Sequence, residues 1–84
     1  MSYISQLRAN IVAAITRKNL TQAAVAERMD IPANALSSRL HGHIPFRLPE
    51  LLLLAALLES SLDQLLDGVE EEYREQYFGQ GSDE

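Results

Sequence analysis

The first eighteen residues carry apolar side chains at steps of three and four positions. This spacing places them on one side of a helix with 3.6 residues per turn, and it predicts a helix over residues 3–18. The members of this stripe are Ile4, Leu7, Ile11, Ala14 and Ile15. Two cations, Arg17 and Lys18, fall in the last turn, where the helix dipole favours positive charge.

Two shorter segments with helical signals follow, and a sharp turn is predicted between them. Thr21 suits the N-cap of a helix over residues 21–30, because its hydroxyl can accept a hydrogen bond from a free backbone N–H. Asp30 is expected to take the left-handed conformation that ends this helix. Pro32 is tolerated in a first helical turn, and it predicts a third helix over residues 32–41 that Gly42 terminates. Two short helices joined in this way are typical of a helix-turn-helix.

The remaining chain predicts further helices and no strand. Residues 48–58 are apolar on every side of a helix, residues 60–68 contain a capping box between Ser61 and Gln64, and residues 69–78 can form a last helix. We therefore expect an all-α fold, with a five-helix domain over residues 1–68. An acidic segment over residues 69–84 would hold a short sixth helix and a loose end.

The charge of the chain is divided unevenly. Residues 1–47 hold six Lys or Arg and two Asp or Glu, a net charge of 6 − 2 = +4. Residues 48–84 hold one Arg and ten acids, a net charge of 1 − 10 = −9, and the two parts sum to −5. The first part can therefore approach a polyanion such as DNA, and the second part cannot.

The predicted third helix presents a polar outer face that contains no acid. Leu36 and Leu40 define its inward direction. A rotation of 100° per residue then turns Ser38 outward, with Asn34 beside it and Ser37 on a flank. Short side chains of this kind can enter the major groove and bind base edges, and Asn can pair with adenine. The alternative is an ordinary solvated helix face.

Residues around this helix are candidates for contacts to DNA phosphates. If the third helix lies in the major groove, the first turn of the second helix and the loop after the third meet the DNA backbone. The cations that end the first helix lie close in sequence to Thr21. For Arg39, a surface ion pair is the alternative. The phosphate candidates are Arg17, Lys18, Thr21, Gln22, Arg39, His41, His43 and Arg47.

The stretch "LTQAAVAERMDIPANALSSRLHG" resembles the helix-turn-helix of the phage repressor and Cro-like family, also called XRE-type regulators. "LPELLLLAALLESSLDQLLDG" resembles the pair of helices that closes that fold, so the resemblance covers about residues 3–68. Asp30 and Pro32 differ from the family's usual Gly and Ser or Thr. The resemblance implies a transcription regulator, such as a phage or prophage repressor, whose third helix reads operator DNA. By position it implies that Gln22 holds a phosphate and that Ala33, Asn34 and Ser38 face bases.

One short helix reads too few base pairs for useful specificity, so we expect a homodimer that reads two half-sites. The helix over residues 48–58 needs cover on all sides, which its own domain, the C-terminal segment or a second copy can supply. The expected interface residues are Leu53, Leu57, Tyr73, Tyr77 and Phe78. The acidic segment can instead fold back on the basic face and weaken non-specific binding.

Several other classes of function find little support. The chain has no cysteine, and its two histidines have no acid nearby in their loop, so we expect no metal site. No nucleophile motif predicts an enzyme, and we expect no cofactor and no small-molecule substrate. The longest apolar run has eight residues, so we expect no membrane span. The absence of cysteine fits a reducing compartment, and we expect a cytoplasmic protein. The rival to a DNA-binding regulator is a protein-interaction module, such as an antirepressor, that keeps the fold without binding DNA.

Overall fold

The computed structural model describes the backbone of residues 3–78 and the side chains of residues 5–71 and 73–75. The described part is all-α, as predicted, and α1 (Tyr3–Arg17) is its longest helix. The others are α2 (Gln22–Arg28), α3 (Ala33–Leu40), α4 (Leu48–Leu57), α5 (Leu62–Leu65) and α6 (Glu71–Phe78). None of these helices has the length and hydropathy that a membrane span needs.

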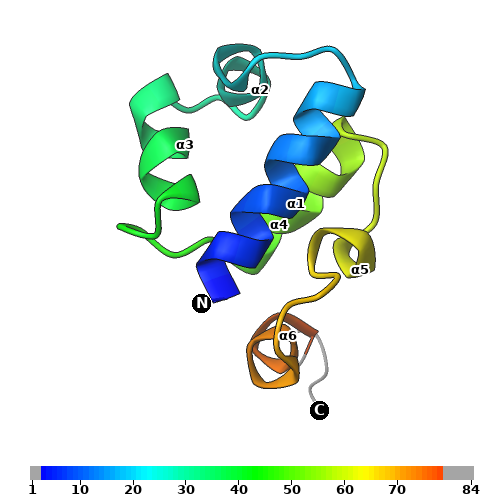
Figure 1. The fold of residues 1–84 in the computed structure, drawn as a ribbon. Coiled ribbons are helices and arrows are strands. Elements are labelled where there is room, and N and C mark those ends of the chain that lie inside the picture. The colour runs from blue at the N-terminus through cyan, green and yellow to red at the C-terminus, as the bar shows by residue number, and fades with distance from the viewer. Residues whose placement is uncertain (1–2, 79–84) are drawn as a thin grey trace.

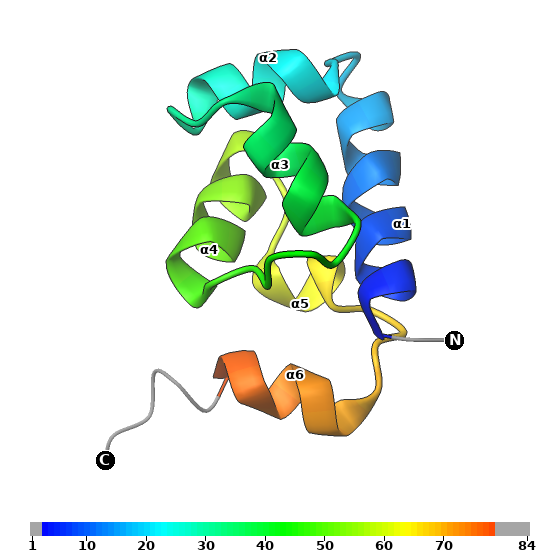
Figure 2. The same ribbon diagram turned by 90° about the vertical axis from the view of Figure 1, so that its left-hand side faces the viewer.

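The helices enclose one hydrophobic core. In Figure 2, α1 and α4 lie on two sides of the core, α2 crosses one end and α3 lies in front. α5 packs against both α1 and α4 (Figure 1). The predicted stripe of α1 supplies Leu7, Ile11, Ala14 and Ile15 to this core, and α4 supplies Leu51, Leu54 and Ala55. The core is therefore built from the apolar side of every helix from α1 to α5.

The turn between α2 and α3 is determined locally. The Thr21 hydroxyl accepts a hydrogen bond from the Ala24 N–H at 3.0 Å, which confirms it as the N-cap. Asp30 has φ 62°, as predicted, and the Ile31 N–H bonds back to the carbonyl of Ala26 at 3.0 Å. Pro32 is the N-cap of α3, so this helix begins one residue later than predicted. Asp30 and Pro32 thus provide the turn without a glycine.

An ion pair joins α3 to α4. Nε and Nη2 of Arg39 each lie 3.0 Å from Oε2 of Glu50, and Nη1 donates to the carbonyl of Ala35. The other carboxylate oxygen, Oε1, accepts a hydrogen bond from the backbone N–H of Arg47 at 2.9 Å and so caps α4. Burial by itself raises the pKa of Glu50. The hydrogen bonds from Arg47 and Arg39 and the charges of both residues outweigh that effect and hold the pKa below its ordinary value of 4.5.

Asn10 fastens the four-residue helix α5 to α1. Its side-chain Nδ2 donates to the carbonyls of Leu65 at 2.8 Å and of Asp67 at 2.7 Å, and its Oδ1 accepts from Gln6. The predicted capping box is present at the other end of α5, where Ser61 and Gln64 exchange hydrogen bonds of 2.9 and 3.0 Å. A helix this short has little stability of its own, so these contacts determine where it ends.

The C-terminal segment packs at the α5 end of the domain. Val69 is buried, Tyr73 is half-buried against the core, and Arg74 forms an ion pair with Asp63 of α5. Figures 1 and 2 place α6 at the far end of the molecule from α2. The described part of the acidic segment therefore does not lie over α2.

Replacing Asn10 by Ala should destabilise the domain by about 1–2 kcal/mol, because two carbonyls lose their hydrogen bonds. The gain in helix propensity offsets only about 0.6 kcal/mol of that loss. Urea denaturation measures the change, with Gln6→Ala as the control that removes the hydrogen bond to Asn10 and leaves both bonds to the carbonyls in place. An Asn10→Ala protein as stable as the original would show that α5 does not depend on this residue.

The Arg39–Glu50 pair should make stability depend on pH on the acid side of 4.5. The folded pKa of Glu50 is lowered, so its contribution is fully present above the ordinary pKa and is lost as pH falls through the folded pKa. Glu50→Gln should cost about 1–3 kcal/mol at pH 7 and much less at pH 3. Urea denaturation at both values measures the two differences, and equal differences would contradict the assignment.

Candidate nucleic-acid interface

The outer face of α3 and the start of α2 form one surface, which we call the α2–α3 surface. Leu36 and Leu40 are fully buried and fix the rotation of α3 about its axis. The opposite side of α3 therefore faces solvent, toward the viewer of Figure 2. None of the residues of α3 is acidic, so no carboxylate on this helix would repel a phosphate.

The four predicted base-reading residues differ in exposure. Ala33 and Asn34 are exposed at the N-terminal end of α3, and the Asn34 carboxamide has no partner among the described residues. Ser37 and Ser38 are half-buried. The chain turns back at this point, and the His43 N–H donates to the carbonyl of Ser38 at 2.9 Å. Helical rotation alone turned Ser38 outward, whereas the residue is half-buried in the structure.

Gln22 and the loop after α3 flank these positions. Gln22 is exposed in the first turn of α2 and has no side-chain partner among the described residues. His41, His43 and Arg47 are also exposed, and the two imidazole rings stack with centroids 6.4 Å apart. Nδ1 of His41 lies 2.9 Å from the carbonyl oxygen of Ser37, which ties the ring to the last turn of α3. The Thr21 hydroxyl serves as the cap of α2.

Arg39 belongs to the α3–α4 ion pair and not to the open surface. Its side chain is 17% exposed, and its guanidinium contacts Glu50 and the carbonyl of Ala35. Of the two alternatives for this residue, the structure shows the ion pair. The sequence contained a signal for it only in the acid at position 50, whose proximity depends on how α3 packs against α4.

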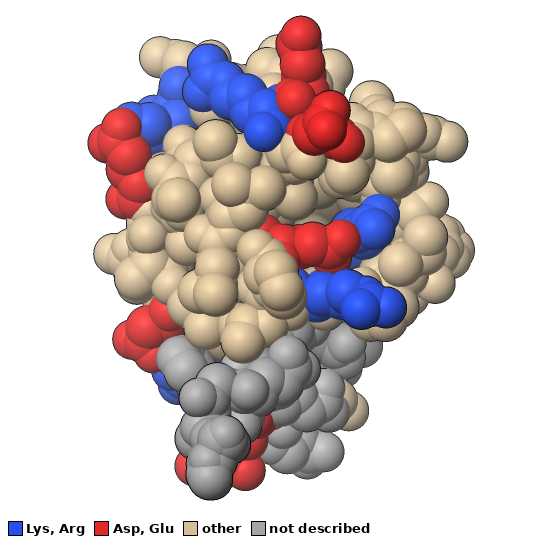
Figure 3. All heavy atoms as spheres, turned by 180° about the vertical axis from the view of Figure 1, so that it is seen from behind, with Lys and Arg blue, Asp and Glu red and all other residues tan. Residues whose placement is uncertain are grey.

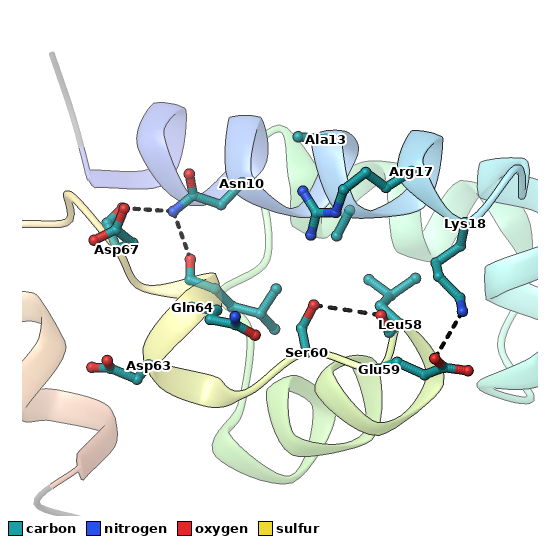
Figure 4. A pocket seen from close by; sticks show the side chains of 12 residues that line it. Asn10, Ala13, Arg17, Lys18, Leu58, Glu59, Ser60, Asp63, Gln64 and Asp67 are labelled. Carbon is teal, nitrogen blue, oxygen red and sulfur yellow. Dashed lines mark hydrogen bonds and ion pairs between the residues drawn. The ribbon is translucent and has the colours of Figure 1, made fainter.

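Arg17 and Lys18 lie elsewhere. Both line a groove of about 560 Å³ between α1 and the α4–α5 region (Figure 4), where Nζ of Lys18 pairs with Glu59 at 3.0 Å. Figure 1 shows that this side of α1 faces away from α3. Asn10 lines the same groove about two helical turns earlier, on the same side of α1 as Arg17 and Lys18. The structure thus does not bring these two cations to the α2–α3 surface.

The outer face of α4 is apolar, and we call it the α4 face. Its exposed members are Pro49, Leu52, Leu53 and Ala56, with Leu57 half-buried beside them. Leu52 is 49% exposed and Leu53 is 39% exposed, which is unusual for leucines of one helix. Figure 3 views the molecule from this side and shows a broad uncharged area with charged side chains around it. Tyr73 packs against its own core, and the side chains of Tyr77 and Phe78 lie outside the described residues.

Within the described residues, no three His, Cys, Asp or Glu side chains are grouped so that they could hold a metal ion. The histidine pair therefore lacks further ligands of these types. What the α2–α3 surface offers is hydrogen-bond donors and acceptors of neutral side chains, with Arg47 and the two imidazoles at one edge. This chemistry suits nucleic acid better than a metal or a reacting substrate.

Comparison with known proteins agrees with this geometry. A model of the helix-turn-helix family, of the XRE type found in phage repressor and Cro proteins, matches residues 11–65. No curated protein and no solved structure matches the chain. The matched region is more than half of the chain and contains all of α2, α3, α4 and α5. The chain therefore belongs to the XRE-type helix-turn-helix family, whose members are DNA-binding regulators of transcription.

Proposed function

We propose that this protein binds operator DNA with α3 in the major groove and so controls transcription, as a repressor of phage or prophage type. The observation that carries the proposal is the α2–α3 surface, an acid-free helix face with an exposed and unpartnered Asn34 at its tip. Members of repressor-like folds place the N-terminal residues of this helix against base edges. A cytoplasmic location follows from this role.

The residues of the surface take different roles in this proposal. Asn34 can bind N6 and N7 of adenine, and the methyl group of Ala33 can contact a thymine methyl. Ser37 and Ser38, which are half-buried, complete the set of base-contacting residues. Phosphate contacts come from Thr21, Gln22, His41, His43 and Arg47, on the two sides of α3. Arg39 orients α3 through Glu50, and Arg17 and Lys18 line the groove between α1 and the α4–α5 region instead.

A homodimer completes the proposal, with the α4 face of one copy against that of another. All four exposed residues of α4 are apolar, and the described part of α6 packs elsewhere. The face belongs to the half of the chain with net charge −9, so DNA does not fit it. A second copy does, because a two-fold pair presents two α3 helices to half-sites about one helical turn apart, roughly 34 Å.

One observation favours a second candidate, a module that binds another protein and no DNA. The α4 face is apolar and lies in the acidic half of the chain, as expected of a surface for a foreign protein. A gel-shift assay on random duplex across a salt series discriminates between the two functions. A DNA-binding protein loses affinity steeply as salt rises, whereas an interaction module shows no affinity at any salt concentration.

Within the α2–α3 surface, Asn34→Ala should weaken binding to a selected operator by about 1–3 kcal/mol and relax the preference at one base pair. Gln22→Ala and Arg47→Ala should weaken binding to all sequences alike, because phosphate contacts carry no sequence information. Anisotropy titrations with the operator and with single-base variants of it measure both effects. If Asn34→Ala leaves affinity and preference unchanged, α3 does not read the bases.

On the α4 face, replacing Leu52 and Leu53 together by Gln should convert the dimer to a monomer. Full burial of a leucine side chain contributes about 1.5–3 kcal/mol of binding free energy, and each substitution removes that contribution. The dimer dissociation constant should therefore rise at least about tenfold. Light scattering measures the mass. The control is a chain shortened after Glu70, which keeps the buried Val69 and removes α6. A shortened chain that is monomeric, beside a double variant that stays dimeric, would assign the interface to Tyr73, Tyr77 and Phe78.

A further inference from the structure

The hydrogen bond of His41 constrains what its ring can offer to DNA. Nδ1 lies 2.9 Å from the carbonyl oxygen of Ser37 and 3.4 Å from the hydroxyl oxygen of the same residue. A carbonyl oxygen only accepts hydrogen bonds, so Nδ1 must carry the proton. In the neutral ring Nε2 is then an acceptor, and it has no partner among the described residues.

A neutral His41 therefore presents the wrong group to a phosphate. Phosphate oxygens accept hydrogen bonds, and an unprotonated Nε2 has no hydrogen to donate. Protonation adds that hydrogen and a positive charge at once, and the bond to Ser37 is kept because the imidazolium donates from both nitrogens. Contact with a phosphate thus requires the charged ring.

We infer that His41 binds a DNA phosphate only as the imidazolium, so that each protomer takes up a proton when it binds and affinity rises as pH falls. This inference rests on the proposed function, since it assumes that the α2–α3 surface meets DNA. The direction of this pH dependence follows from the linkage between proton uptake and DNA binding. A bound state that holds more protons than the free state is favoured at low pH, and its advantage is lost as pH rises.

Among the groups around His41, few can take up a proton when DNA binds. The chain has two histidines and no cysteine, so histidine is the side-chain type that bears on binding in the neutral pH range. None of the ion pairs among the described residues involves His41, and its ring stacks with that of His43 at a centroid distance of 6.4 Å. The charged residues on α3, its following loop and the helices packed against them are Arg8, Arg17, Glu27, Arg28, Arg39, Arg47 and Glu50. Of the two acids in this set, Glu50 is held by Arg39 and by the backbone of Arg47.

The test measures the affinity of the full chain for a duplex selected from a random pool at pH 6, by fluorescence anisotropy at constant ionic strength from pH 6 to 8.5. The DNA affinity is expected to fall about five- to tenfold for each protomer between pH 6 and 8.5. A tenfold difference in proton affinity between bound and free protein changes the DNA affinity by the same factor. The variant His41→Asn keeps a nitrogen donor near the position of Nδ1 and lacks Nε2, so its affinity should be low and nearly independent of pH. The variant His41→Lys carries a permanent charge and should bind at pH 8.5 more tightly than the original.

His43→Asn is the matched control, and it should retain most of the pH dependence. If the dependence disappears with His43→Asn and persists with His41→Asn, the inference is overturned and the proton belongs to His43. Equal affinity of the original protein at pH 6 and 8.5 also overturns it, while the proposed function stands. Failure to bind any duplex at either pH, even at low salt, overturns the proposed function and the inference together.

Discussion

The position of α3 depends on the burial of Leu36 and Leu40. An isolated helix of eight residues is not stable in water, because nucleation is costly and few hydrogen bonds follow it. The two leucines are fully buried in the core that α1 and α4 also build, and this burial supplies the stability that the helix lacks. The Arg39–Glu50 pair then limits rotation about the same axis. The α2–α3 surface therefore has a defined geometry only because the opposite side of α3 is packed into the core.

Much of this arrangement could be predicted from local patterns. The apolar stripe of α1, the Thr21 cap, the left-handed Asp30 and the Ser61–Gln64 capping box each depend on residues within a few positions of one another. Helical periodicity and cap chemistry are properties of such short stretches, so the sequence contains them directly. The inward direction of α3 was likewise correct, since Leu36 and Leu40 are buried as the pattern indicates.

The features that were missed depend on contacts between distant segments. Asn10 is separated by 55 positions from the carbonyl of Leu65 to which it donates, and no periodicity relates the two. Proximity in sequence suggested that Lys18 would lie near the first turn of α2, whereas its Nζ pairs with Glu59, 41 positions away. The same reason applies to Ser38, which is half-buried although the pattern of α3 turned it outward. Side-chain environments at the site therefore require the packing of helices, which the pattern of one helix does not contain.

The core holds α3 through some of its residues and leaves others exposed, so the two groups can change independently in evolution. Leu36, Leu40 and Arg39 carry the packing, while Ala33 and Asn34 are exposed and make no side-chain contact that the fold requires. Substitutions at the exposed pair leave the core intact, so under the proposed function new preferences for bases can arise without loss of a stable domain. Paralogues of such a protein can diverge in the genes that they control while their scaffolds remain interchangeable.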